Sequence, residues 1–380
     1  MIELIFYTSL FFIFYVYAGY PLLALMLGNV INRRVNSADY EPSVTILIAA
    51  FNEEESIEAT VRNKLALDYP HEKMELIVIS DESSDRTDEL VKAIEDPRVR
   101  LIRQKPRAGK TSALNMAVPQ ARGEIIVFSD ANSLYAPDAL RRLVANFADP
   151  QVGYVSGKMI YANPDGTPIG EGCSAYMKYE NKLRSLETRL GSIVGVDGGI
   201  DAVRKVLYCS LNADQLPDFV QPLKTVEQGY RVVYEPEALL WEHSLKDSGD
   251  EYRMRVRVSL RALWALFDMR QLLVPGINIL FAWQLWSHKV LRYLCFIFMA
   301  GAFAANALLL CRSQFYSVFF ALQSLCYLMA LLAPTLEKIG ITGRVVTFSR
   351  YFWLLNVAAA HAFGKFILGK KQVIWTPRKG

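Results

Sequence analysis

Two oxygen-bearing side chains that could hold a cation follow an apolar run. Asp130 and Asn132 stand two residues apart, directly after EIIVFS at 124–129. A carboxylate and an amide oxygen at this spacing can face one hard cation, and Mg²⁺ or Mn²⁺ bridging a diphosphate uses such short sets of oxygen ligands. Because a lone DxN pattern is common by chance, the pair needs support from the rest of the chain.

A lysine at an expected helix start could act on the same diphosphate. Lys110 lies in the tripeptide GKT at 109–111, which resembles the end of a phosphate-binding P-loop. The first glycine of that motif would fall at Gln104, so the P-loop pattern fails. A lysine at a helix N-terminus can still neutralise a diphosphate.

Two acidic clusters also follow apolar runs. Asn52 and Glu54 come just after SVTILIAA at 43–50, and Asp81 follows ELIVIS at 75–80. An aspartate at a strand end can accept a hydrogen bond from a base or a ribose. Acidic and hydroxyl residues are equally typical of turns and helix N-termini, so each cluster alone is explained as well by capping.

An alternation of strands and helices would bring these clusters together. Three short apolar runs predict buried strands, at 43–50, 75–80 and 124–129, and residues 99–103 predict a further short strand. Helical patterns alternate with them, at 52–64, 85–94, 112–117 and 137–147. The alternation predicts an α/β domain with a doubly wound, mainly parallel sheet. Ligands bind such sheets at the carboxyl ends of the strands, which is where the clusters fall.

Composition indicates a catalytic domain joined to a membrane part. The chain has 380 residues, of which 52% are apolar, and its mean hydropathy is +0.17. The net charge is only +4, and the basic residues cluster beside apolar stretches, so we expect no nucleic-acid partner. The five cysteines are widely spaced and form no CxxC pair, which argues against a disulfide framework or a zinc site.

The N-terminal stretch predicts a transmembrane helix. Residues 2–31 are almost wholly apolar, and Arg33 and Arg34 follow at once. A signal peptide would carry its positive charge before the apolar run, so we expect an uncleaved helix over 1–34 whose C-terminal end is cytoplasmic. A catalytic domain over 35–250 would then lie in the cytoplasm, at the inner (plasma) membrane.

The C-terminal third predicts further membrane helices. Residues 251–288 carry arginines among large apolar residues and predict amphipathic, interfacial helices. The region 289–380 contains three apolar stretches, at 290–311, 315–334 and 345–368. With the N-terminal helix these would make four spans and would place the C-terminus outside. The basic tail favours the inside, so the sequence leaves the topology open.

Taken in order, the clusters resemble motifs of glycosyltransferase family 2, the inverting nucleotide-sugar enzymes with the GT-A fold. The resemblance covers residues 43–265. It is carried by AAFNEE (49–54), VISDESSDRT (78–87), GKTSALN (109–115), FSDANS (128–133), GVDGGIDAVRK (195–205), PDF (217–219) and EQGYRVVYEPEALLWE (227–242). The flanking helices resemble the membrane-bound branch of the family.

The resemblance implies a nucleotide-diphosphate sugar donor and a metal-dependent hexosyltransferase. Asn52, Glu54 and Asp81 would line the nucleotide pocket, and Lys110 would face the diphosphate. Asp130 would hold Mg²⁺ or Mn²⁺ with Asn132 beside it. The family's metal motif commonly reads DxD, whereas DAN stands here, so metal affinity or choice could differ.

The resemblance also implies a sugar site and a catalytic base. Three residues would lie near the sugar or the acceptor: Asp197, Gly198 and Gly199. Asp218 would deprotonate the acceptor hydroxyl, because inversion by a single displacement must release that proton. The family's base commonly follows an acidic residue, but Pro217 precedes Asp218, and Asp214 is a rival base.

Polymer-making relatives carry a QxxRW motif on an interfacial helix, and this chain departs from it. The best match is MRVRV at 254–258, in which Arg255 and Arg257 could still clamp a phosphate. The glutamine and the tryptophan of the motif have no counterpart there. This departure favours single transfer over processive synthesis.

The sequence therefore predicts inverting transfer of a sugar from a nucleotide-diphosphate sugar to a membrane-associated acceptor. The acceptor would be a lipid-linked intermediate or a surface polysaccharide, with membrane lipid around it. One alternative is a processive polysaccharide synthase that extrudes a polymer, with a homo-oligomer completing the channel. Another is a non-catalytic membrane scaffold with a transferase fold.

Overall fold

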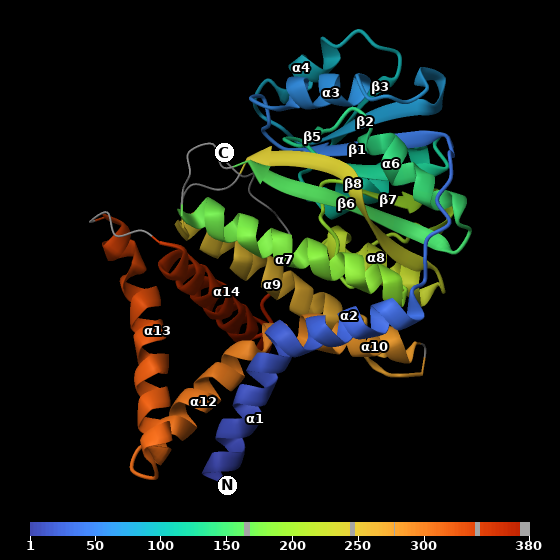
Figure 1. Cartoon of the computed structure of the whole chain (residues 1–380). Helices are drawn as coiled ribbons and strands as arrows, with labels where there is room; N and C mark the ends of the chain where they lie inside the picture. The colour runs from blue at the N-terminus through green and yellow to red at the C-terminus, as the bar shows by residue number, and fades with distance from the viewer. Residues whose placement is uncertain (163–167, 244–247, 277, 339–342, 373–380) are drawn as a thin grey trace.

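A helix-covered sheet and a group of projecting helices make up the structure (Figure 1). The computed structural model describes residues 1–162, 168–243, 248–276, 278–338 and 343–372. The end of the expected C-terminal membrane region, 373–380, lies outside the described residues.

The described residues form one sheet of eight strands in the order β3-β2-β1-β4-β7-β6-β8-β5. The strands are β1 Val44–Ala50, β2 Met74–Asp81, β3 Val99–Gln104, β4 Ile125–Asp130, β5 Leu134–Tyr135, β6 Val152–Ala162, β7 Asp201–Arg204 and β8 Arg231–His243. All neighbours among β3, β2, β1 and β4 are parallel, and so are β6 and β8. Only β7 and β5 run against their neighbours, which confirms the mainly parallel sheet.

The register of the parallel half brings the polar clusters to one edge. Ala50 on β1 pairs with Ser80 on β2, and Ala49 pairs with Asp130 on β4. All seven residues of β1 are buried, as expected for a central strand covered on both faces. The residues after β1, β2 and β4 therefore leave the sheet side by side.

Helices cover both faces of this sheet. One face packs against α3 (Ile57–Leu65), α4 (Thr87–Lys92) and α6 (Ala139–Ala145). The other packs against α5 (Lys110–Ala117), α8 (Pro217–Glu227), α9 (Ser248–Asp268) and α10 (Ile279–Leu285). The expected interfacial segment 251–288 thus contributes buried side chains of α9 and α10 to the core of the α/β domain.

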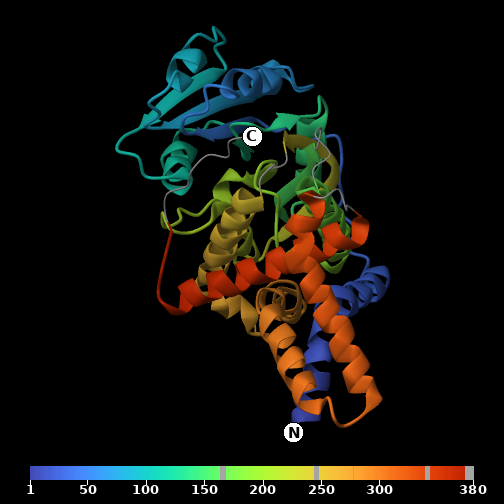
Figure 2. The same ribbon diagram turned by 90° about the vertical axis from the view of Figure 1, so that its left-hand side faces the viewer.

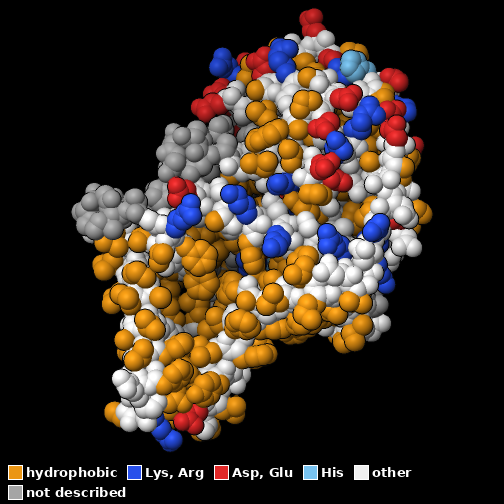
Figure 3. All heavy atoms as spheres, viewed as in Figure 1, with side chains coloured by type: hydrophobic (Ala, Val, Ile, Leu, Met, Phe, Trp, Pro, Cys, Tyr) orange, Lys and Arg blue, Asp and Glu red, His pale blue; other side chains and the backbone are white. Residues whose placement is uncertain are grey.

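Three helical segments project away from the sheet, where Figure 2 shows α1, α12 and α13 together. The first runs through α1 (Ile2–Phe14), a π-helical turn and α2 (Tyr20–Ile31). It is long and apolar enough to cross a membrane. The same holds for residues 314–333, which belong to α13 (Gln314–Lys338). A third candidate is the pair formed by 279–293 and α12 (Cys295–Leu309), which is bent by 58°. Apolar side chains cover the outside of this part (Figure 3).

The stretch expected as a third C-terminal span has another place in the structure. Helix α14 (Arg344–Ile367) is not among the candidate spans of the described residues. It packs on α9, where Ala358 and Ala362 meet Val256 and Leu260. Among the described residues two C-terminal segments are therefore candidate spans, whereas α14 packs against α9.

Buried polar contacts fasten the N-terminal helix to the α/β domain. The Tyr20 hydroxyl donates to Glu187 of α7 (Pro168–Leu190) over 2.6 Å. His288 contacts the same carboxylate at 2.7 Å and lies 3.2 Å from Glu180. All four side chains are buried, so these polar groups depend on one another for partners.

Replacing Tyr20 with phenylalanine would remove one of these donors. We expect Tyr20→Phe to lower the free energy of unfolding by about 1–2 kcal/mol, because a buried carboxylate loses a hydrogen bond. Thermal unfolding of the full chain in detergent micelles measures this change. The matched control is Tyr7→Phe, because Tyr7 is half-exposed and its hydroxyl lies 3.3 Å from that of Tyr316. Equal melting temperatures for the two variants would contradict the prediction.

Candidate active site

A cavity of about 330 Å³ opens at the carboxyl edge of the parallel strands and extends towards the projecting helices. It is lined by residues from the ends of β1 and β4, the start of α5, the start of α8, and helices α7, α9 and α14. Many of the residues singled out from the sequence line it: Lys110, Asp130, Asn132, Asp197, Gly198, Asp218, Arg255 and Arg257.

Lys110 joins two carboxylates at the centre of this edge. Its ammonium donates to Asp130 Oδ1 at 2.8 Å and lies 3.4 Å from Asp218 Oδ1. Lys110 begins α5, Asp130 ends β4 and Asp218 lies in the first turn of α8. Three segments far apart in the sequence therefore place one cation between two anions.

The pKa values of the two partners follow from burial and charge. Burial lowers the pKa of Lys110, but the charges of Asp130 and Asp218 outweigh it, so the pKa lies above the ordinary value. Burial raises the pKa of Asp218, and the charge of Asp130 adds to this, whereas Lys110 opposes it. A carboxylate with a raised pKa is a stronger base than an exposed aspartate.

The rival base Asp214 has a different environment. It is paired with Lys371 at 2.5 Å and does not line the cavity. Asp218 lines it directly after Pro217, which occupies the first turn of α8, where proline is well tolerated.

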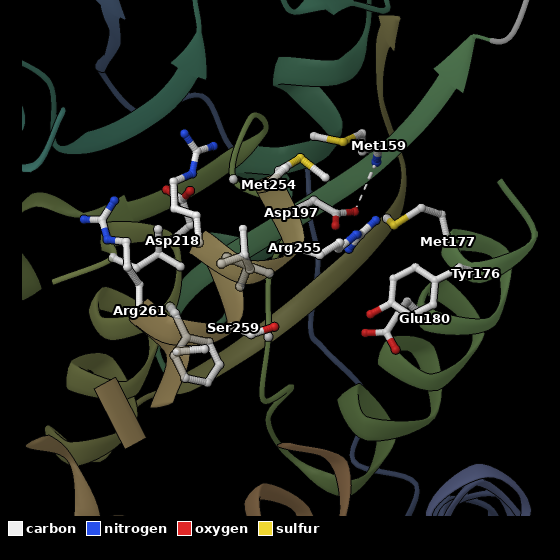
Figure 4. A pocket seen from close by; sticks show the side chains of 18 of the residues that line it. Met159, Tyr176, Met177, Glu180, Asp197, Asp218, Met254, Arg255, Ser259 and Arg261 are labelled. Carbon is white, nitrogen blue, oxygen red and sulfur yellow. Dashed lines mark hydrogen bonds between the residues drawn. The ribbon is translucent and has the colours of Figure 1, made fainter. Parts of the chain in front are cut away.

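The GVDGG segment forms the next part of the wall. A side chain at Gly198 would place its Cβ 2.1 Å from Asp218 Oδ2, so only glycine leaves room for that carboxylate. Asp197 is buried, pairs with Arg184 at 2.5 Å and accepts from the Met159 amide at 3.3 Å. Figure 4 shows Asp197 between Asp218 and Glu180. Gly199 lies behind the wall and does not line the cavity.

Three residues expected at the nucleotide pocket hold loops in place and do not line the cavity. Asn52 accepts from the Ser84 amide at 2.8 Å, and Glu54 accepts from the Arg86 amide at 3.2 Å. Asp81 is fully buried and accepts from the amides of residues 108 and 109 at 2.9 and 3.0 Å. Asp81 thereby positions the loop that leads into Lys110.

Glu53 is a cavity residue that the sequence reading passed over. It lies between Asn52 and Glu54, and it lines the cavity where they do not. Burial raises the pKa of Glu53 to about 7, and the charge of Asp130 adds to this, while a hydrogen bond from Ser56 opposes it. The acidic turn after β1 indicated a residue at the site, but the sequence does not show which of its side chains lines the cavity.

The arginines of α9 lie at two ends of the cavity. Arg255 points towards Tyr176 and Met177, whereas Arg261 lies on the side of Asp218 (Figure 4). Arg255 is held by Glu251 at 2.8 Å and by the Tyr351 hydroxyl at 2.7 Å. Arg261 was not singled out as a site residue, and it is the arginine whose charge acts on Asp218.

The donor set fits a divalent cation that a diphosphate helps to hold. Asp130 and Asn132 both line the cavity and offer oxygen atoms. Among the described residues no three His, Cys, Asp or Glu side chains form a metal-binding group. Mg²⁺ is commonly bound by one or two carboxylates together with substrate phosphates, and these residues match that pattern.

Comparison with known proteins identifies the domain that carries this cavity. Residues 45–216 match the family model described as glycosyl transferase family 2. Over these residues, a little under half of the chain, the domain is therefore similar to glycosyl transferase family 2.

Curated relatives of the family 2 domain include two synthases. The chain is 30% identical over 227 residues to poly-beta-1,6-N-acetyl-D-glucosamine synthase of Staphylococcus aureus, which is 58% of this chain and 55% of that protein. It is 34% identical over 168 residues to beta-monoglucosyldiacylglycerol synthase of Trichormus variabilis, covering 43% and 36%. The chain thus spans about half or less of the length of these relatives.

A solved structure shows the same fold along nearly the whole chain. The mannosyltransferase PcManGT from Pyrobaculum calidifontis, determined with GDP-Man and Mn²⁺, matches with a TM-score of 0.74 at 23% identity. The match covers 97% of this chain and 100% of that one. The family 2 domain and its helices therefore have a GT-A-like architecture.

The contact between Gly198 and Asp218 can be tested. We expect Gly198→Ala to displace the Asp218 carboxylate and to reduce glycosyl transfer about a hundredfold, because small misplacements of reacting groups are costly. Release of nucleoside diphosphate measures transfer, and nucleotide affinity should stay unchanged. The control is Gly364→Ala in α14, where an added Cβ meets nothing within 4 Å. Full turnover in Gly198→Ala would contradict the role of this contact.

Proposed function

We propose that this protein transfers a sugar from a nucleotide-diphosphate sugar to a membrane-associated acceptor, with inversion at the anomeric carbon. The observation that carries the proposal is the meeting of Lys110, Asp130 and Asp218 in the cavity of a family 2 domain. The relatives support it, since they are named as synthases of a polysaccharide and of a glycolipid.

Asp218 would act as the general base. An inverting displacement needs a group that takes the proton of the attacking hydroxyl, and burial gives Asp218 a raised pKa suited to this task. Lys110 would neutralise the departing diphosphate, because it lines the cavity at the N-terminus of α5. Asp197 and Gly198 would bound the space between the donor sugar and the acceptor.

Asp130 and Asn132 would hold Mg²⁺ or Mn²⁺. When bound, the ion would supply positive charge that stabilises the leaving diphosphate. Glu53 lies close enough for its pKa to respond to the charge of Asp130, so it would add negative charge to this side of the cavity. These groups support a hexosyltransferase that depends on a divalent metal.

The catalytic domain would face the cytoplasm of a multi-pass protein at the inner (plasma) membrane. Arg33 and Arg34 follow the first candidate span, as the positive-inside rule expects of a cytoplasmic end. Three candidate spans would return the chain to that side. The ion pair of Lys371 with Asp214 supports this reading, and so does the 2.9 Å bond from Trp264 to the Lys370 carbonyl.

Replacing the base would separate chemistry from binding. We expect Asp218→Asn to lower transfer by about 10²–10⁴-fold, because that is the typical contribution of general-base catalysis. Nucleotide affinity should change little. Transfer is measured by incubating membranes that carry the protein with a panel of nucleotide sugars and assaying the nucleoside diphosphate released. The size of the product distinguishes single transfer from polymer synthesis. The control is Asp214→Asn; if only that variant lost activity, Asp214 would be the base.

Removal of divalent metal should stop the reaction. We expect EDTA to abolish turnover and Mn²⁺ or Mg²⁺ to restore it, because the cavity offers few protein ligands and the ion would exchange readily. Restoration should fail in Asp130→Ala. Full activity in metal-free buffer would contradict the assignment of Asp130 and Asn132 as metal ligands.

A further inference from the structure

The cavity does not stop at the sugar site. Beyond Asp197 it continues to Glu180 on α7, as Figure 4 shows. Its inner end is lined by Tyr17 from the N-terminal helix, by Lys289 and Arg292, and by Leu355 and Ala359 of α14. One continuous space therefore connects the expected base with helices that project towards the membrane.

Most cationic side chains at this end are fully engaged. Arg292 pairs with Glu180, and its guanidinium lies over the rings of Tyr17, Tyr176 and Tyr179 at 5.1–5.8 Å. Arg184 also has several partners, which are Asp197, Asn181 and the carbonyl of residue 195. These arginines are held by the protein itself.

Lys289 differs from them. Among the described residues its ammonium has one ion-pair partner, Glu180 at 3.8 Å, and makes no hydrogen bond. The side chain is only 12% exposed, and it lines the cavity. A Cβ on Gly195 would lie 2.6 Å from its Nζ, so this glycine leaves the ammonium room beside the segment that carries Asp197 and Gly198.

A partly buried ammonium that lines a cavity and makes no hydrogen bond with the described residues favours an anionic ligand. Lysine is a compact point charge that binds phosphate well. Around it the wall is amphiphilic, because apolar Leu355 and Ala359 and the ring of Tyr17 accompany the charges. Free phosphate would gain nothing from these surfaces, whereas the first methylenes of a lipid would pack on them.

We propose that Lys289 binds the phosphate of a lipid-linked phosphosugar acceptor. The sugar hydroxyl that is glycosylated lies at Asp218, the sugar follows the wall formed by Asp197 and Gly198, and the phosphate reaches Lys289. The lipid continues past Tyr17 and α14. This inference rests on the proposed function and narrows its acceptor to one chemical class.

Binding of dodecyl phosphate to the purified full chain in detergent micelles tests the proposal. We expect Lys289→Met to weaken binding at least about tenfold, the equivalent of about 1.4 kcal/mol for a lost charged hydrogen bond. Lys289→Arg should stay within about threefold of the unmodified protein, since it keeps the charge. The control is Lys178→Met, which removes an exposed lysine of α7 and should leave affinity unchanged.

A second variant moves the ammonium without removing it. Gly195→Ala should also weaken the binding of dodecyl phosphate, because the new Cβ would displace Lys289 Nζ. If Lys289→Met fails to fold, the affinity of Gly195→Ala for dodecyl phosphate tests the role of Lys289. Binding of UDP or GDP with Mn²⁺ is measured in parallel and should be the same in all variants.

Three results would overturn the proposal. They are no binding of dodecyl phosphate to the unmodified protein, equal affinity in Lys289→Met, and equal affinity for inorganic phosphate and dodecyl phosphate, which would assign the site to free phosphate. The measurement of nucleotide binding distinguishes failure of the Lys289 proposal from failure of the proposed function. If the unmodified protein bound neither UDP nor GDP, the result would contradict the donor site, whatever the affinity for dodecyl phosphate.

Discussion

The contact of Lys110 with Asp130 and Asp218 is the constraint on which the site depends. It joins the first turn of α5 to the end of β4 and to the first turn of α8. Two carboxylates this close repel each other unless a cation lies between them, and in a buried site that repulsion is weakly screened. The same cation would meet the diphosphate, so the group that stabilises the site is also the group that the proposed reaction uses.

This contact is possible because the parallel strands end together. The pairing of β1 with β2 and β4 aligns their carboxyl ends, and the loops that follow fasten one another. Asp81 holds the loop before Lys110 in place, since both of its carboxylate oxygens accept hydrogen bonds from backbone amides of that loop. Residues that would face a nucleotide by family resemblance, such as Asn52 and Glu54, here hold neighbouring loops, and their neighbour Glu53 faces the cavity.

The helices outside the sheet extend the cavity. Helix α7 carries Arg184 to Asp197 and Glu180 to the inner end, while Glu187 is bonded to Tyr20 and lies beside His288. One helix thus links the wall that contains Asp197, the inner end of the cavity and the N-terminal candidate span. The candidate spans also take part in the cavity, since Tyr17 of the N-terminal segment lines it. Apolar side chains cover the face of the projecting helices that Figure 3 shows.

The sequence by itself determined the parallel half of the sheet and the positions of Lys110 and Asp130 relative to strands and helices, because apolar runs and the polar residues beside them are local signals. Only the tertiary structure decided that β6 and β8 extend the sheet, that α14 packs on α9, and that Lys289 reaches the cavity. These features depend on contacts between distant segments, and on side-chain directions that differ between adjacent residues, as at Asn52 and Glu53. No local pattern encodes either.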